Sequence, residues 1–277
     1  DTSIAAGERL QIEQRIEGQN LQAFAKGTSD AKPFAVSFYV KGNASATYVC
    51  ELFDEDNSRQ CSKTFNVTTD WTRVELTFPA DTTGAFDDDN NSSLLLIIFL
   101  HAGSTFAGGT LNSSSFASVT NANRAAGGSS FFDSTDRTFF ITGVQLEVGQ
   151  NPTEFEHEPF DVTYKKCIRY FENVGYASGT YIYAAAYAYA TDGGRAVQHY
   201  THKRATPSFS FNNQTDLVAY YNGSSTDADP NFNYHDVGLN SCRVTITLTG
   251  VSTTAGYALA IYNNGGSTYD VKVDAEL

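Results

Sequence analysis

Four tyrosines lie within the stretch YIYAAAYAYATDGG, residues 181–194, and each combines an apolar ring with a hydroxyl at its tip. They are Tyr181, Tyr183, Tyr187 and Tyr189, and small apolar residues occupy the alternate positions. Because successive side chains of a β-strand point to opposite faces, we expect these rings on one face and the alanines in a tightly packed layer on the other.

A row of tyrosine rings fits three kinds of surface. The rings can bury in a core or a subunit interface, stack on the CH face of a sugar, or simply lie exposed. We place the core or interface first and the glycan platform second.

A second candidate for recognition is the stretch YYNGSSTDADPNFNYHD, residues 220–236. It mixes Tyr220, Tyr221, Tyr234 and His235 with Asp227 and Asp229. Loops on a rigid β-sandwich often carry the recognition residues, so this stretch is a candidate binding loop. We place an ordinary flexible loop first and the binding loop second.

Patterns for catalysis are absent from the sequence. Glycoside cleavage needs a pair of carboxylates flanking the bond, and no such pair stands out among the 31 acidic residues. There is no Gly-x-Ser-x-Gly elbow and no His-Glu-x-x-His helix. We therefore expect a protein that is not an enzyme.

Calcium is the one cofactor that the acidic stretches suggest. DEDN (54–57) and ADTTGAFDDDNN (80–91) offer the carboxylate and carbonyl oxygens that Ca²⁺ takes, but neither has the spacing of an EF-hand. Acidic stretches of this kind are more often solvated turns, so we expect no cofactor and keep calcium as the alternative.

The four cysteines do not form a zinc pattern, because no Cys-x-x-Cys pair occurs. Cys50 and Cys61 flank a hairpin that turns at DEDN, which makes them a candidate for a cross-strand disulfide. Cys167 and Cys242 are typical of lone thiols in a reducing compartment, and buried thiols remain the alternative for the first pair as well.

The formal net charge of −13 argues against nucleic acid as a partner, because phosphate binding needs clustered lysine and arginine. The longest apolar run, LLLIIFL (94–100), is too short to cross a membrane and predicts a strand buried on both faces. The sequence contains no methionine, so we expect a fragment or a processed product.

Alternating apolar and polar residues predict antiparallel strands along most of the chain. Examples are FAVSFYVKG (34–42), TRVELTFPA (72–80) and SCRVTITLTG (241–250). EPFDVTYKKCIRYF, following residue 157, has the only clear helical spacing. We therefore expect an all-β chain of two β-sandwich domains: a jelly roll over 1–158, a connector helix over 159–168 and a second sandwich over 169–277.

Several stretches resemble a module of tail-fibre and other virion-surface proteins of tailed bacteriophages. They lie at 12–42, 68–106 and 139–172, and the last is the most specific: an ITGVQLEVG strand, a TEFE turn and a short helix ending in C-x-RYFE. KRATPSFSF (203–211) and the terminal DAEL resemble the C-terminal part of the same family. In that family the module looks like the jelly roll of a carbohydrate-binding module.

The resemblance implies a homotrimeric fibre or spike on the virion, assembled in the host cytoplasm, that attaches to a cell-surface glycan and joins other virion proteins through its N-terminal part. Two features depart from the family. Its module has strands upstream of IEQRIEG (12–18), so we expect the first domain to be cut short, and Cys50 and Cys61 are not family features. A decorating virion protein without receptor role and a polysaccharide depolymerase remain as alternatives.

Overall fold

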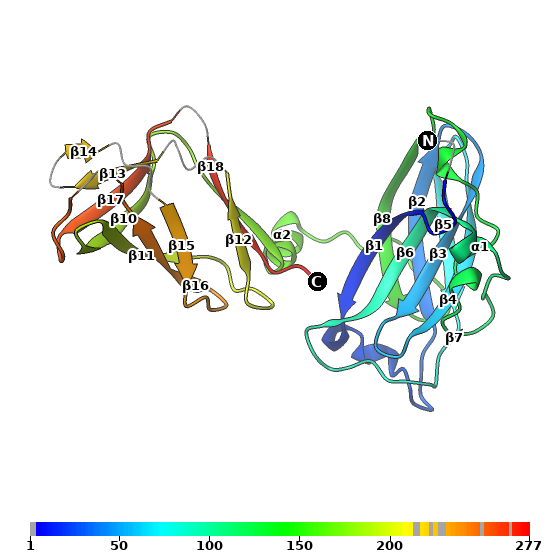
Figure 1. Ribbon diagram of the computed structural model, residues 1–277. Helices are drawn as coiled ribbons and strands as arrows, with labels where there is room; N and C mark the ends of the chain where they lie inside the picture. The colour runs from blue at the N-terminus through cyan, green and yellow to red at the C-terminus, as the bar shows by residue number, and fades with distance from the viewer. Residues whose placement is uncertain (1–3, 213–216, 222–223, 227–230, 250–251, 266–267) are drawn as a thin grey trace. The chain divides into compact units, whose positions relative to one another are not determined.

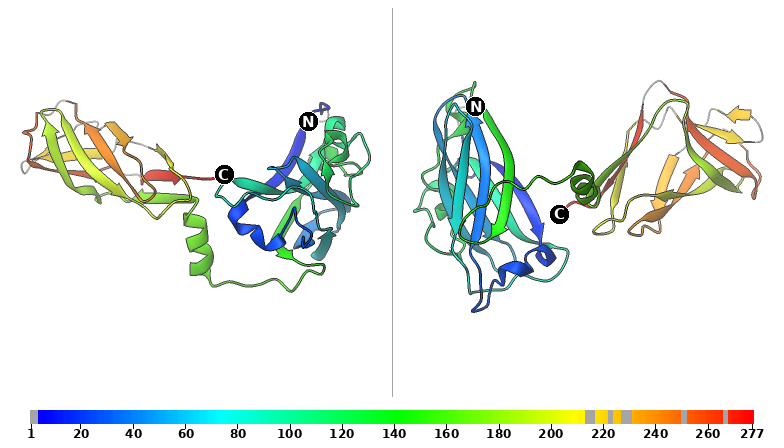
Figure 2. Two further views of the ribbon diagram at one scale, coloured as in Figure 1. Left: turned by 90° about the horizontal axis from the view of Figure 1, so that it is seen from below. Right: turned by 180° about the vertical axis from the view of Figure 1, so that it is seen from behind.

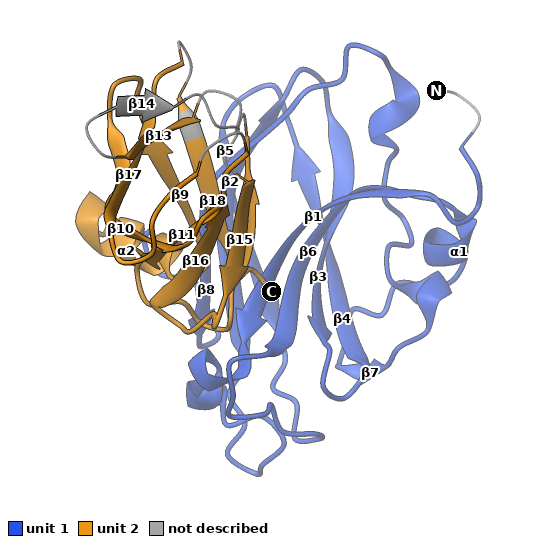
Figure 3. Cartoon of the chain, turned by 60° about the vertical axis from the view of Figure 1, so that its left-hand side comes forward, with its two compact units in different colours: residues 1–157 blue, residues 158–277 orange. Residues whose placement is uncertain are grey.

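The computed structural model describes residues 4–212, 217–221, 224–226, 231–249, 252–265 and 268–277. The chain divides into two compact units, unit 1 over Asp1–His157 and unit 2 over Glu158–Leu277 (Figure 3). Both units consist of antiparallel sheets with few short helices, which confirms the predicted all-β fold class. No helix among the described residues has the length and apolarity needed to cross a membrane.

Unit 1 is a sandwich of a five-stranded sheet, in the order β1-β6-β3-β4-β7, and a three-stranded sheet, in the order β5-β2-β8 (Figure 1). Every pairing in the two sheets is antiparallel. The strands are β1 (Arg9–Glu17), β2 (Phe34–Gly42), β3 (Ala46–Asp54), β4 (Arg59–Val67), β5 (Thr72–Phe78), β6 (Ser92–Ala102), β7 (Ala117–Ser118) and β8 (Phe139–Val148).

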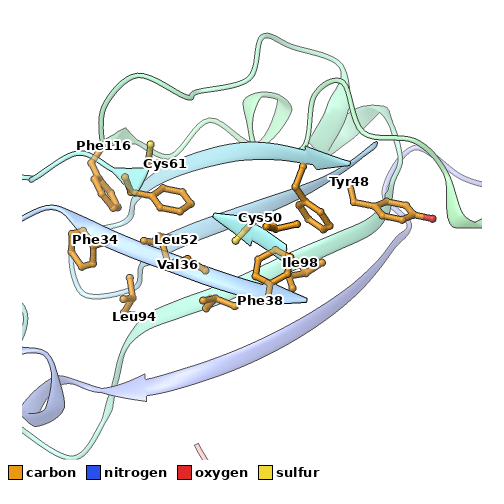
Figure 4. Packing of buried hydrophobic residues seen from close by; sticks show 14 of the residues in the cluster. Phe34, Val36, Phe38, Tyr48, Cys50, Leu52, Cys61, Leu94, Ile98 and Phe116 are labelled. Atoms are coloured by element: carbon orange, nitrogen blue, oxygen red, sulfur yellow. The ribbon is translucent and has the colours of Figure 1, made fainter. Parts of the chain in front are cut away.

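The core of unit 1 lies between these sheets, where the apolar member of each alternating pair points inward. In Figure 4, Phe34, Val36 and Phe38 of β2 lie among Leu52 and Ile98 of the facing sheet. The run over 94–100 forms the middle of β6, which lies between β1 and β3 and is buried on both faces. The prediction of a strand covered on both sides is therefore confirmed.

The outer face of β6 is covered by residues 103–137, which we call the cover segment. It contains α1 (Ser104–Ala107), β7 and the short 3₁₀ turns η3 (Asn121–Asn123) and η4 (Phe131–Asp133). Ala125 packs with Leu95 and Ile97 in a second, smaller cluster. The Arg124 side chain donates to buried Glu51, with Nη2 2.6 Å from Oε2, so an ion pair holds this otherwise irregular segment on the sheet.

After β8 the chain folds back along unit 1 as a strap, residues 149–156. The Thr153 backbone N–H donates to Glu147 Oε2 at 3.0 Å, and the Glu156 N–H donates to Gln145 Oε1 at 2.8 Å. Thr77 Oγ1 donates to the Gln150 carbonyl at 2.6 Å. The polar residues of the QLE and TEFE stretches thus fasten the chain that leaves the sandwich.

The predicted disulfide between Cys50 and Cys61 is wrong. Both thiols are free and buried in the core of unit 1, where Figure 4 shows them as separate side chains. In the β3–β4 hairpin Cys61 lies opposite Leu52, and Cys50 lies opposite Lys63. The cysteines are therefore diagonal neighbours, about 7–8 Å apart between Cα atoms, which exceeds the usual reach of a disulfide.

Unit 2 contains a seven-stranded sheet, in the order β14-β13-β17-β10-β11-β16-β15, and a three-stranded sheet, in the order β12-β18-β9 (Figure 1). Apolar residues of both sheets form its core, among them Leu259, Ile261, Val271 and Val273. The strands are β9 (Phe171–Tyr176), β10 (Tyr181–Ala190), β11 (Gly193–His199), β12 (Ser208–Phe211), β13 (Leu217–Tyr221), β14 (Ser224–Thr226), β15 (Asn231–His235), β16 (Ser241–Thr247), β17 (Ala258–Asn263) and β18 (Tyr269–Asp274).

Helix α2 (Phe160–Ile168) precedes β9 at one end of unit 2 (Figure 2). None of its residues is buried, and Phe160 is 82% exposed. The rings of Phe160 and Tyr164 stack with their centroids 5.8 Å apart on the helix surface. Phe160 and Tyr164 therefore form an exposed aromatic pair on this helix.

Candidate functional site

Strand β10 does not present its tyrosines as a regular row. Between Tyr181 and Tyr183, and again between Tyr183 and Ala186, β10 has one residue more than its partner β17. Each such bulge puts two successive residues on the same face. Ile182 and Tyr183 are therefore both buried, and Ala184 and Ala185 are both exposed.

The prediction of a common face is thus wrong for Tyr183, which belongs to the core of unit 2 and contacts the ring of Phe232 at 5.8 Å. Tyr181, Tyr187 and Tyr189 do lie exposed on the outer face of the seven-stranded sheet. The bulges expose only the small residues Ala184 and Ala185 between the rings of Tyr181 and Tyr187. This leaves a shallow depression in the surface of the sheet.

A shallow cavity of about 350 Å³ lies over this gap, and we call it the tyrosine trough. Its floor is formed by alanines of β10 and β17, and tyrosines rise at its margins. The lining residues are Tyr181, Ala184, Tyr220, Tyr257, Ala258, Leu259 and Ala260. The volume falls at the lower end of the range for small-ligand sites.

Two tyrosines that line the trough, Tyr181 and Tyr220, pack against a third ring on the strand between theirs. The Tyr262 ring lies between Tyr181 and Tyr220, with centroids 5.6 Å from each. Tyr257 immediately precedes β17 in the run GYALAIYNN. Tyr181 and Tyr257 are 55% and 56% exposed, so ring area in the trough is free to contact a ligand.

The remaining tyrosines of β10 differ in what they offer. Tyr187 is exposed and lies opposite Arg195 on β11. The Arg195 guanidinium lies 4.3 Å from the centre of the Tyr189 ring, in a cation–π contact. Gly193 permits this packing, because a Cβ there would lie 2.7 Å from the Tyr189 ring. Tyr189 therefore has one ring face occupied by a charged group.

The predicted binding loop at 220–236 is wrong as a single site. Tyr220 and Tyr221 are on β13, whereas Tyr234 and His235 are on β15. The sheet order places β17, β10, β11 and β16 between them, a separation of roughly 24 Å at the usual strand spacing. Asp227 and Asp229 lie outside the described residues.

The members of that stretch have separate environments. Tyr220 lines the trough. The Tyr221 hydroxyl accepts from the Thr254 N–H at 2.7 Å, and the Tyr234 ring stacks on Phe209 at 4.2 Å, so both mainly stabilise the sandwich. His235 is exposed and lies opposite Arg243 at the end of β15.

Sequence reasoning missed Tyr257, which lines the trough, and Tyr262, which packs between two of the lining tyrosines. The available signal was the Ala-x-Ala-x-Tyr spacing of residues 258–262, which puts two small residues and one ring on the same face. The sequence pattern does not reveal that β17 pairs with both β10 and β13, which brings these residues together.

The two acidic stretches proposed for calcium meet in unit 1. Asp54, from the first, and Asp81, from the second, both contact the ammonium of Lys26. Across the described part of the chain, no group of three or more His, Cys, Asp or Glu side chains could hold a metal ion. The two carboxylates already face an internal cation.

Comparison with known proteins does not identify a family for this chain. No family model matches the chain, and no curated protein matches it significantly. Among solved structures, the PBSX exported protein XepA is 10% identical over 98% of this chain and 84% of its own, with a TM-score of 0.21. The T=1 Penaeus vannamei nodavirus is 10% identical over 99% and 93%, with a TM-score of 0.22.

A third match, Red Clover Necrotic Mosaic Virus, is 12% identical over 98% of this chain and 93% of its own, with a TM-score of 0.20. Similarities at this level do not establish a common fold. The functional argument therefore depends on the chain's own residues.

Proposed function

We propose that this protein is a non-enzymatic component of a phage virion surface that attaches the particle to a host cell by binding a glycan in the tyrosine trough. The virion assignment is supported by the resemblance of residues 12–42, 68–106 and 139–172 to tail-fibre proteins. The trough itself is the observation that carries the binding proposal.

The shape and chemistry of the trough suit a sugar. Tyrosine rings stack on the apolar CH face of a pyranose, and their hydroxyls can bond to its hydroxyl groups. The alanines of the floor, Ala184, Ala258 and Ala260, let a flat ring approach the sheet closely. Because the lining residues carry no formal charge, we expect an uncharged glycan to bind better than an anionic one.

The same lining gives no support to cleavage of the bound sugar. A glycoside hydrolase uses two carboxyl groups about 5 to 9 Å apart on either side of the scissile bond. The trough is lined by tyrosine, alanine and leucine side chains. We therefore assign it to binding and release.

We further propose that the protein works as a homotrimer whose contacts include α2. The exposed Phe160 and Tyr164 pair on this helix is the feature that supports self-association. A single shallow trough binds weakly, and linking several troughs in one particle raises avidity without new contacts.

The binding proposal is tested by measuring the intact protein on an array of immobilised uncharged and anionic bacterial glycans. Tyr181→Ala and Tyr257→Ala should each lower the affinity about tenfold, the equivalent of one stacking contact of about 1.4 kcal/mol. Ala260→Ile should lower it as well, because its side chain fills the floor while every tyrosine stays in place.

Tyr187→Ala is the matched control, because it removes an exposed tyrosine of the same strand that does not line the trough. Equal losses in the control and in Tyr181→Ala would contradict a site at the trough. Absence of binding by the wild-type protein at high density would favour a purely structural virion role, and release of reducing ends would contradict the non-enzymatic assignment.

A further inference from the structure

The ammonium of Lys26 lies inside a set of oxygen atoms that comes from two separate parts of unit 1, the end of β3 and the loop that follows β5. Its Nζ is 2.5 Å from Asp54 Oδ2 and 3.2 Å from Asp81 Oδ2. It also donates to the backbone carbonyls of Thr83, at 2.9 Å, and Gly84, at 2.6 Å. We call these four oxygens the oxygen cage.

The charged side chains that meet at the cage are buried. The side chains of Lys26, Asp54 and Asp81 are 1%, 0% and 5% exposed. Asp81 also accepts from Arg59, whose Nε lies 2.7 Å from Oδ2 and whose Nη2 lies 3.0 Å from Oδ1. Two buried carboxylates thus face two cations, and the cluster is neutral as a whole.

Carboxylates and backbone carbonyls are the oxygens that calcium takes in proteins. A lysine ammonium differs from a metal ion in that it is tethered, so it cannot be lost by dilution or chelation. It also donates to the backbone carbonyls of residues 83 and 84, which ties their loop to the turn that carries Lys26.

We propose that Lys26 is the built-in cation of a calcium-type oxygen cage, which makes the folding of unit 1 independent of divalent metal and leaves a latent Ca²⁺ site when the lysine side chain is removed. The ammonium joins the turn after η2 (Gln22–Phe24) to the β3–β4 hairpin and to the loop that follows β5. Removal of the ammonium leaves a net charge of −1 in the cluster, and removal of the Arg59 charge as well leaves −2.

The experiment compares thermal unfolding of the full chain in EDTA and in millimolar calcium. The wild-type transition should be the same in both buffers. Lys26→Ala should unfold at a clearly lower temperature in EDTA and recover part of the loss with calcium. Lys26→Ala with Arg59→Gln should bind calcium more tightly than the single variant, because its cage carries one more uncompensated negative charge.

Lys26→Met is the matched control: it fills the volume of the lysine stem but leaves no room for an ion, so calcium should not restore its stability. A wild-type transition that moves with calcium would overturn the proposal, because folding of the wild-type chain would then depend on a divalent ion. Lys26→Ala that matches the wild type in EDTA, or that folds in neither buffer, would overturn it too.

Discussion

A one-residue change of spacing decides what each tyrosine of β10 does. Tyr181 and Tyr183 are two positions apart, yet the bulge between them sends the first ring outward and the second into the core. A second bulge, between Tyr183 and Ala186, exposes two successive alanines and so opens the floor of the trough. The trough and this part of the core therefore derive from two neighbouring irregularities of one strand.

Substitution of Tyr183 should lower the stability of unit 2 much more than substitution of Tyr181. Tyr183→Ala removes a core ring and should lower the free energy of unfolding of unit 2 by about 3 kcal/mol, as other large-to-small core truncations do. Tyr181→Ala removes an exposed ring and should change it by less than about 0.5 kcal/mol. Denaturant unfolding of both variants measures the difference, and equal effects would contradict the assigned faces.

The thiols should differ sharply in reactivity. Burial raises the pKa of Cys61 to about 11 and that of Cys242 to about 11, and it also raises the pKa of Cys50, so these thiols stay protonated near neutral pH. Cys167 is exposed on α2. Alkylation of the native protein at pH 8 should therefore label Cys167 alone, with the other cysteines labelled after denaturation.

Mass spectrometry of the labelled protein reads this out directly. A Cys50–Cys61 bond would appear as two thiols that resist alkylation even in denaturant. Cys167→Ser should abolish labelling of the native chain.

At the scale of elements, the strands could largely be predicted from the sequence because each one alternates between a buried and an exposed face. FAVSFYVKG became β2, and the run over 94–100 became the doubly buried β6. Pairing could not be predicted in the same way. Nothing local indicates that Tyr220 and Tyr234 lie on strands near opposite edges of one sheet, or that an extra residue in β10 reverses Tyr183.

The cover segment shows how one long-range pair stabilises an element without regular structure. Arg124 contacts Glu51 across 73 residues of sequence and also lies 4.7 Å from the centre of the Phe53 ring. Arg124→Ala leaves a buried carboxylate and should cost about 3 to 5 kcal/mol. Hydrogen exchange should show that amide protection falls first within residues 103–137.

Replacing both partners, as in Glu51→Gln with Arg124→Met, should restore much of that stability, because no uncompensated charge then remains in the interior. Equal protection of residues 103–137 in the wild type and in Arg124→Ala would contradict the role of the pair.

Unit 1 should lose stability in acid through Asp81. Burial pushes the pKa of this carboxyl upward, but the hydrogen bonds from Arg59 and Thr83 and the charge of Lys26 together hold it below its ordinary value. A carboxyl with a lowered folded pKa stabilises the fold above its unfolded pKa, about 3.9, and the contribution disappears as the pH falls through the folded value.

Unfolding of wild type and Asp81→Asn across pH 2 to 6 tests this. The wild type should lose stability below about pH 4. The variant should be less stable near neutral pH and show a shallower acid decline. If the stability of both proteins fell in parallel with pH, Asp81 would be excluded as the source of the acid sensitivity.

At the scale of the whole molecule, the two units carry different tasks in the proposed function. Unit 1 is held by neutral internal ion pairs, and unit 2 presents the exposed tyrosines. We expect Phe160→Ala with Tyr164→Ala to convert the proposed trimer to monomer, because it removes the stacked pair on α2.

Light scattering coupled to size-exclusion chromatography measures that change. Lys165→Ala, an exposed substitution on the same helix, is the control and should leave the mass unchanged. A single-chain mass for the wild type would contradict the trimer and the avidity argument, while leaving binding by one trough intact.

The strap would have a mechanical consequence in the proposed role of attaching a particle to a cell. A pulling force that enters unit 1 from the direction of residue 158 meets the Glu156–Gln145 hydrogen bond first and the Thr153–Glu147 bonds next. These bonds lie upstream of the β2–β8 ladder along the line of tension. Under load the strap would detach from unit 1 before the β2–β8 pairing breaks. The extended linker between the two units would then be longer, and the strap would bind again when the force falls.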